Sequence, residues 1–253
     1  MPEPLDPHRR DWEELATLDP LWAIASRRDK RFGGWEHDEF FATGQQEFDA
    51  MLGPARERGL CAQRAAALDF GCGVGRITRA MAACYDHVVG VDIAPSMIDQ
   101  AKQLNGDLEH VEFLVSSGDD LRFLGDRRFD LVFTHVVLQH QPGRGAARRY
   151  IEEFLRVLRP GGVIVFQLPV QMAWRHRGLL ARRLYLLLRT LKVPTRVLYE
   201  RLKLHPISML FVPQDEVVRW VTEAGGHVEH VVREPSGAGH VSATFSVTAR
   251  SDT

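Results

Sequence analysis

A glycine-rich loop, Gly71-Cys72-Gly73-Val74-Gly75, is the segment of this sequence best suited to hold a ligand. The apolar run before it, residues 65–70, is typical of a buried strand, and residues 76–84 after it have the pattern of a helix. Glycines let a backbone approach a ligand closely, and the start of a helix offers N–H groups without intrahelical partners. The loop therefore predicts a nucleotide-like ligand at a helix N-terminus.

Two acidic residues restrict the class of ligand. A dinucleotide fingerprint has the spacing G-x-G-x-x-G, whereas here the glycines alternate and Asp69 precedes them. A carboxylate at that place would repel a pyrophosphate but could receive an ammonium group, directly or through water. Asp92 follows about 20 residues after the loop, where a carboxylate can bind ribose hydroxyls or instead cap the next helix. The two acids favour a nucleoside that carries an amino acid.

The elements that must position these residues alternate between strands and helices. Further apolar runs predict strands at 87–91, 111–115, 129–134, 163–168, 228–234 and 243–249. Helical patterns lie at 95–104, 145–158 and 214–224. This alternation predicts parallel pairing in a doubly wound α/β sheet, and the turn at 235–237 predicts that the last two strands form an antiparallel hairpin at the sheet edge.

Composition excludes several classes of protein. The chain has 253 residues, 45% of them apolar, and a formal net charge of −1, which disfavours nucleic acid as the main partner. The odd set of cysteines, Cys61, Cys72 and Cys84, lacks metal-type spacing and indicates reduced thiols in a cytoplasmic protein. Residues 1–20 lack the apolar core of a signal peptide, and the excess of Arg over Lys suggests a bacterial source.

Five segments together resemble the class I S-adenosylmethionine-dependent methyltransferase family, in its small-molecule type. They are LDFGCGVG at 68–75, GVDIA at 90–94, GDDL at 118–121, FDLVF at 129–133 and LRPGG at 158–162. The resemblance covers roughly residues 65–168 and 213–250. It implies the Rossmann-like methyltransferase fold with a mostly parallel seven-stranded sheet, S-adenosylmethionine as methyl donor, and S-adenosylhomocysteine as product.

The resemblance also implies a set of cofactor contacts. The methionine part would lie against Asp69, Gly71, Cys72, Gly73, Gly75 and Arg76, and the ribose against Asp92. The adenine would meet Ile93, Met97, Asp119 or Asp120, and Leu121, although Asp119 is also explained as a surface turn residue. Thr134 and His135, at the end of the fourth strand, would lie near the methyl group.

Two segments outside the core are expected to cover the site. Residues 1–60 are interpreted as an N-terminal helical cap on a core of residues 61–253; within the cap Trp35, Phe41, Thr43 and Gly44 would cover the sulfonium, or simply pack as an amphipathic helix. Residues 171–212 are basic and leucine-rich and interrupt the alternation after strand five. They are interpreted as a helical lid, with a dimer contact or a membrane-surface helix as alternatives.

Two histidines are candidates for the base that removes a proton from the acceptor. A histidine titrates near neutral pH, and His140 is preferred over His135. No metal is expected, because Thr134 and His135 stand where metal-dependent members carry acids. The sequence thus predicts methylation of a small molecule, at oxygen of a specialised metabolite or sugar, in a possible homodimer. Alternatives are a non-methylating relative of cyclase or decarboxylase type, a membrane-peripheral methyltransferase of a lipid or quinone, and a dinucleotide-dependent oxidoreductase.

Overall fold

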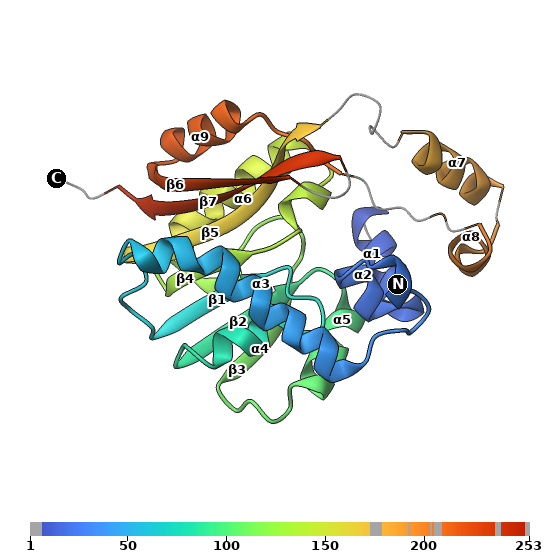
Figure 1. Ribbon diagram of the computed structural model, residues 1–253, viewed down its shortest axis with the longest axis horizontal. Helices are drawn as coiled ribbons and strands as arrows, with labels where there is room; N and C mark the ends of the chain where they lie inside the picture. The colour runs from blue at the N-terminus through green and yellow to red at the C-terminus, as the bar shows by residue number, and fades with distance from the viewer. Residues whose placement is uncertain are drawn as a thin grey trace.

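A single seven-stranded sheet forms the centre of the computed structural model, which describes residues 7–172, 179–191, 193–202, 204, 209–235 and 239–250 (Figure 1). The strand order is β3-β2-β1-β4-β5-β7-β6. Strands β1 to β5 pair in parallel, and β7 pairs antiparallel with both β5 and β6. The strands are β1 (Ala66–Phe70), β2 (His87–Asp92), β3 (Val111–Val115), β4 (Phe129–Thr134), β5 (Leu158–Met172), β6 (Gly226–Pro235) and β7 (His240–Ala249). The mostly parallel sheet and its edge hairpin are confirmed.

The central strands are buried because helices cover both faces of the sheet. Every residue of β1 and of β4 is buried, as expected for parallel strands in a doubly wound fold. Strand β5 is longer than the predicted 163–168. Its first residue, Leu158, pairs with Phe129, and its last residues pair with β7 out to His240. The extra length thus comes from partners that are distant in the sequence.

The helices of the core begin and end close to the predicted bounds. They are α4 (Arg76–Ala82), α5 (Pro95–Leu104), α6 (Arg144–Val157) and α9 (Gln214–Glu223), with short 3₁₀ turns η2 (Arg122–Leu124) and η3 (Leu138–His140). On one face of the sheet, Tyr150 and Phe154 of α6 and Trp220 of α9 pack in a large apolar cluster. On the other face, Met81 of α4 packs with Phe133 of β4.

The predicted N-terminal cap divides into two parts. Helix α3 (His37–Glu57) buries Phe48 and Leu52 in the same cluster as α4, so it belongs to a helical layer of the core. Helices α1 (Pro7–Leu18) and α2 (Pro20–Ile24), followed by the turn η1 (Arg28–Lys30), pack in a separate cluster with residues of the glycine loop and α5. The start of α3 reaches the same cluster through Phe40.

The described part of the insertion forms two helices, α7 (Leu179–Thr190) and α8 (Thr195–Glu200). They lie beside α1 and α2, away from the sheet (Figure 1). Arg189 of α7 contacts Glu14 of α1 at 2.7 Å, and the hydroxyl of Tyr199 in α8 donates to Asp19 at 2.7 Å. The insertion is therefore attached to the N-terminal helices.

Candidate functional site

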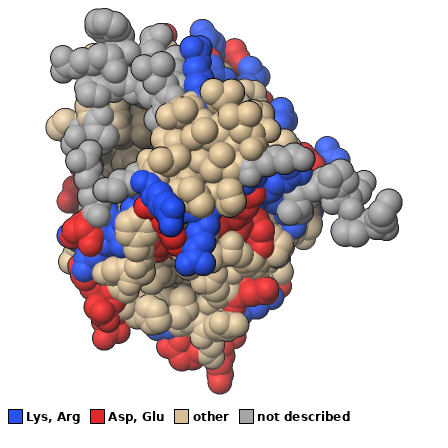
Figure 2. All heavy atoms as spheres, turned by 90° about the vertical axis from the view of Figure 1, so that its right-hand side faces the viewer, with Lys and Arg blue, Asp and Glu red and all other residues tan. Residues whose placement is uncertain are grey.

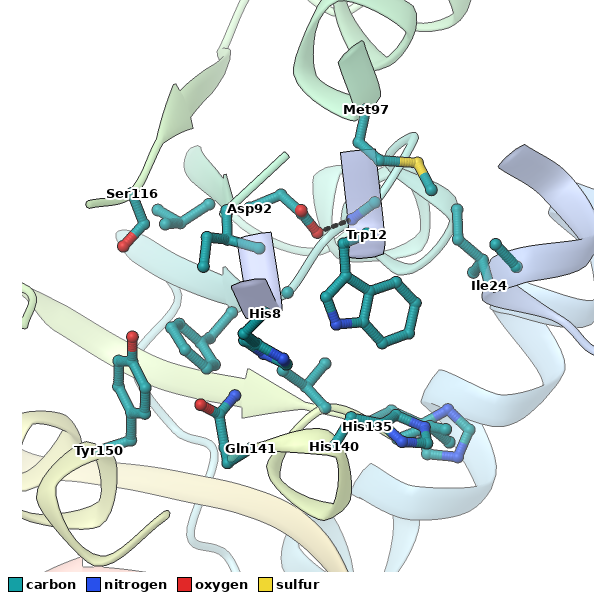
Figure 3. Close-up of a pocket in the computed structure, with 18 residues that line it drawn as sticks. His8, Trp12, Ile24, Asp92, Met97, Ser116, His135, His140, Gln141 and Tyr150 are labelled. Atoms are coloured by element: carbon teal, nitrogen blue, oxygen red, sulfur yellow. Dashed lines mark hydrogen bonds between the residues drawn. The ribbon is translucent and has the colours of Figure 1, made fainter. Parts of the chain in front are cut away.

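A cavity opens at the carboxyl ends of β1, β2 and β4, the edge where doubly wound sheets bind ligands (Figure 3). It encloses about 770 Å³ of space, its open mouth included. The core contributes Phe70, Gly71, Gly73, Val91, Asp92, Ile93, Met97, Ser116, His135, Val136, Val137, His140, Gln141 and Tyr150, and the N-terminal helices contribute His8, Trp12, Ala23 and Ile24.

The glycine loop forms the floor of this cavity. Gly71 and Gly73 have φ values of +76° and +54°, in the left-handed region that favours glycine. A Cβ on Gly71 would lie 2.2 Å from Val137, and one on Gly73 would lie 2.5 Å from Ile24. The absence of side chains is therefore required here, and it exposes backbone to the cavity. Gly75 also has a positive φ but lies outside the lining.

Asp92 joins the glycine loop to the second strand. Its Oδ2 accepts a hydrogen bond from the Gly73 N–H at 2.9 Å (Figure 3). Its Oδ1 accepts one from the Ala94 N–H at 2.9 Å. Burial raises the pKa of this carboxyl, although the backbone donors oppose the shift. Each oxygen keeps a further lone pair at the cavity edge. The residue thus orders the loop and remains suited to accept from ribose hydroxyls.

Asp69 does not face the cavity, contrary to the expected contact with an ammonium group. Side chains alternate along a strand, so Phe70 reaches the cavity while Asp69 points toward α4, where it accepts from the Thr78 hydroxyl at 2.6 Å. Burial raises its pKa to about 7. Cys72 is likewise outside the lining, packed against Ile98 and Phe113.

The residues expected to cover the sulfonium lie outside the lining of the cavity. Trp35 is buried against Phe40 and donates its indole N–H to Ala25 O at 3.1 Å. Phe41 lies beside Arg79, Thr43 accepts from Arg76, and Gly44 also packs on Arg76. They start the core helix α3, so the cavity is covered instead by side chains of α1 and α2, chiefly Trp12 and Ile24 (Figure 3).

Of the predicted adenine contacts, two line the cavity and three do not. Ile93 and Met97 line the cavity. Asp119 is exposed, Asp120 accepts from the Arg122 N–H at 3.1 Å, and Leu121 is buried in the apolar cluster under α6; none of the three lines the cavity. The polar side chains on the wall between β3 and α6 are Ser116, Gln141 and Tyr150. These three side chains are placed where they can contact the heterocyclic base of a nucleoside.

A carboxylate positions His135 at the cavity wall. Its Nδ1 lies 3.1 Å from Oε2 of Glu47, an ion-pair distance at an angle outside that of a well-formed hydrogen bond. The same oxygen accepts from the Arg76 guanidinium at 2.5 Å, and Arg76 is buried and outside the lining. Burial would raise the pKa of Glu47, but His135 and Arg76 outweigh it and lower that pKa to about 2. Glu47 is therefore ionised at neutral pH.

His140 lies on the same wall, in η3 (Figure 3). Its ring centroid is 5.5 Å from that of Trp12, with the planes tilted by 59°. Between the two histidines Val136 has a φ of +61°, which is costly for a β-branched residue and is typical of functional sites. Thr134, expected near the methyl group, is buried and its hydroxyl has no hydrogen-bond partner; it is outside the lining.

Several site residues could not be found from motifs alone. His8 and Trp12 are four residues apart and share one face of α1, which is a signal that the sequence did contain. Glu47 lies in α3 and Tyr150 in α6, at positions that ordinary amphipathic patterns explain equally well. Only the tertiary structure brings Glu47 to His135.

The lining residues fit a nucleoside that carries an amino acid. Two glycines expose backbone, one carboxylate stands at the edge, and the remaining wall is mainly apolar with a few polar side chains. Within the described residues no group of three or more His, Cys, Asp or Glu side chains could hold a metal ion.

Comparison with known proteins identifies the domain. A family model described as "Methyltransferase domain" matches residues 68–166. Residues 68–166 are therefore similar to a methyltransferase domain. S-adenosylmethionine is the methyl donor of this family. The match covers the glycine loop, Asp92, both histidines and Tyr150, but not α1, α2 or the insertion.

Curated methyltransferases share only this domain with the chain. A malonyl-[acyl-carrier protein] O-methyltransferase of Yersinia pestis is 34% identical over 106 residues, which are 39% of this chain and 34% of that protein. A demethylmenaquinone methyltransferase of Clavibacter sepedonicus is 38% identical over 101 residues, 39% of this chain and 38% of that protein. The chain thus matches little more than a third of either relative's length.

Solved methyltransferase structures share the fold over nearly the whole chain. A magnesium protoporphyrin IX methyltransferase from Synechocystis with bound S-adenosylhomocysteine aligns with a TM-score of 0.59 at 16% identity, covering 94% of this chain and all of that one (100%). An N-methyltransferase from Bradyrhizobium japonicum, also with S-adenosylhomocysteine, gives 0.61 at 16% identity, covering 96% and 99%. These similarities extend the methyltransferase fold beyond the matched domain.

Proposed function

We propose that this protein transfers a methyl group from S-adenosylmethionine to an oxygen of a small-molecule acceptor, such as a specialised metabolite or a sugar. The observation that carries the proposal is the cavity in which the glycine loop and Asp92 face His135, which Glu47 positions. Methyltransferases similar to the chain are named for acyl, quinone and amine acceptors. The choice of oxygen depends on the histidines, because a hydroxyl must lose its proton during transfer.

The residues of the chain have separate tasks in this reaction. Gly71 and Gly73 would expose their backbone to the methionine part of the cofactor, Asp92 would accept from the ribose hydroxyls, and Ile93 and Met97 would contact the adenine. When bound, S-adenosylmethionine supplies an electrophilic methyl group. The enclosing wall would hold the acceptor in line with that group. Such alignment of the reacting atoms contributes much of the rate enhancement of a direct displacement.

His135 is the better candidate for the base, in place of the His140 preferred from the sequence. Its Nδ1 faces Glu47, so Nε2 is the nitrogen left to take the proton of the acceptor hydroxyl. The imidazolium that forms is stabilised by the ionised Glu47, while Arg76 holds the carboxylate in place. His140 and Trp12 then form a tilted aromatic wall against which an acceptor can pack.

A lipid or quinone acceptor is the second candidate. The exposed leucines at Leu184 and Leu187 of α7, and at Leu191 directly after it, favour it because they are suited to an apolar environment. Relatives that match this chain include methyltransferases named for demethylmenaquinone and for 2-methyl-6-phytyl-1,4-hydroquinone. The two candidates differ only in the acceptor, since the cofactor residues are the same.

Calorimetric titration followed by a transfer assay tests the proposal. The protein should bind S-adenosylhomocysteine and not NAD, and it should transfer radiolabelled methyl to a member of a panel of hydroxylated metabolites, sugars and quinols. Binding of NAD in preference to S-adenosylhomocysteine would contradict the cofactor assignment. Transfer to carbon or nitrogen that is unaffected by His135→Ala would contradict the proposed base.

A further inference from the structure

Helix α7 has one face bound to the protein and one face left exposed. On the bound face Tyr185 is buried, and Arg189 contacts Glu14 of α1 at 2.7 Å. On the opposite side Leu184 and Leu187, with Leu191 directly after the helix end, are 46%, 57% and 67% exposed. Their spacing of three and four residues aligns them along one side of the helix. We refer to these three residues as the leucine face.

The surroundings of the leucine face are apolar and basic. Leu186 and Leu202 are also exposed, at 43% and 50%. Figure 2, which views the side of the molecule where α7 and α8 lie, shows a broad area of uncharged residues with charged residues of both signs along its borders. Isolated exposed leucines are common, but a contiguous apolar patch on a protein surface marks an interaction site.

The charge of the insertion is strongly one-sided. Residues 179–204 contain seven Lys and Arg but a single acid, Glu200, which pairs with Arg196 at 2.8 Å. Arg183 and Arg201 are exposed. A partner that covers the leucine face must therefore tolerate several positive charges at its border and is favoured by carrying negative ones.

We propose that α7 docks on an anionic lipid bilayer, with the leucine face at the boundary between headgroups and acyl chains. Leucines on one side and basic residues around them are the pattern of helices that lie in the plane of a membrane. No helix among the described residues is long and apolar enough to span a bilayer. Symmetric pairing of two copies through this face would bring equivalent arginines together, which disfavours a second copy as the occupant.

This docking stands apart from the proposed function, because it requires neither cofactor nor acceptor. The test is co-sedimentation of the full chain with vesicles of phosphatidylcholine alone and with vesicles that contain about a third phosphatidylglycerol. We expect binding to the anionic vesicles only, decreasing as salt rises from 0.05 to about 0.5 M. Each basic residue near the surface contributes roughly a fivefold factor, so Arg183→Gln should weaken binding by about that factor, whereas Arg219→Gln on α9 should not.

The apolar contribution is tested by Leu187→Gln combined with Leu191→Gln. Both side chains are exposed, so the melting temperature should stay unchanged while vesicle binding falls by about tenfold or more. The matched control is Phe123→Gln, an apolar residue that is 47% exposed in η2. Failure of the unaltered protein to bind anionic vesicles would overturn the proposal. Vesicle binding that the leucine substitutions leave intact would also overturn it. So would leucine substitutions that dissociate a dimer of a protein that does not bind lipid.

Discussion

Glu47 is the residue through which the core layer of helices reaches the reaction site. Its carboxylate is shared between Arg76, which is 5% exposed, and His135, which is 14% exposed. A buried arginine needs a counter-charge, and a histidine that acts as a base benefits from a carboxylate that stabilises its protonated form. One side chain meets both needs, so structural and functional requirements coincide at this position.

Replacing Glu47 by Gln should weaken the base and leave binding of the cofactor intact. We expect kcat to fall by about 10- to 100-fold, because the imidazolium that forms during transfer loses its counter-charge. The rate is measured with a radiolabelled methyl donor. Asp49→Asn, on the same helix and paired with Arg56, serves as control.

A kcat of Glu47→Gln that matches that of the unaltered enzyme would show that Glu47 only supports Arg76. His135→Ala should then be compared with His140→Ala. If His135 is the base, its loss lowers kcat by roughly 10²-fold or more. The loss of His140 should act mainly on KM, since its ring packs against Trp12 at the wall.

Asp69 gives the protein a pH-dependent stability. Because burial raises its pKa to about 7, the folded state keeps a proton between pH 4 and 7 that the unfolded state has released. The free energy of unfolding should therefore fall as pH rises through this interval and level off above it. Asp69→Asn should remove this contribution, which is at most about 4 kcal/mol.

Denaturant titrations of both proteins at several pH values measure the effect. The difference in unfolding free energy, Asp69→Asn minus unaltered protein, should grow with pH from about 4 to 7 and then stay constant. Asp49→Asn should show no such growth, because hydrogen bonds from Gln45 and Arg56 lower the pKa of Asp49. A constant difference across the interval would contradict a raised pKa at Asp69.

At the scale of elements, the strands and helices of the core were predictable because their signals are local. The apolar runs at 66–70 and 129–134 and the helix at 95–104, which begins with a proline, are visible in a window of a few residues. The cavity wall was not predictable in this way. Helices α1 and α2 have no motif that places Trp12 and Ile24 over the glycine loop, and their role follows from packing between distant segments.

A buried hydrogen bond contributes to the attachment of the insertion to the N-terminal helices. Asp19 accepts from the Tyr199 hydroxyl and from the Phe32 N–H at 2.7 and 2.6 Å. Tyr199→Phe removes a donor from a buried carboxylate, which should cost about 1–3 kcal/mol and make residues 179–204 easier to cleave. Thermal unfolding and limited proteolysis measure these effects.

Tyr185→Phe is the matched control for this prediction. Tyr185 is also buried and also lies in the insertion, but its hydroxyl makes no hydrogen bond of good geometry. The Tyr185→Phe variant should therefore retain most of the stability and the protease resistance of the unaltered protein. Equal losses in the two variants would mean that general packing, and not the bond to Asp19, holds the insertion in place.

At the scale of the whole molecule, cofactor binding should stabilise the fold, because the cavity is lined by both the core and the N-terminal helices. S-adenosylhomocysteine at about 100 times its Kd should add roughly 2.7 kcal/mol. In a chain of this length that corresponds to a rise in Tm of about 5–10 °C. Scanning fluorimetry measures it, with NAD as the control ligand; a rise with NAD of the same size would contradict the assignment.

The Tyr199–Asp19 hydrogen bond and the Arg189–Glu14 ion pair attach the insertion to the N-terminal helices. They connect segments that are about 170–180 positions apart in the sequence. Genetic exchange between related enzymes that replaced only one of these segments would leave Asp19 without its phenolic donor and Glu14 without its arginine. Chimeras with a new acceptor preference should therefore be built by transplanting both segments together. Selection is expected to act on the pair as one heritable unit, although the methyltransferase domain separates them in the gene.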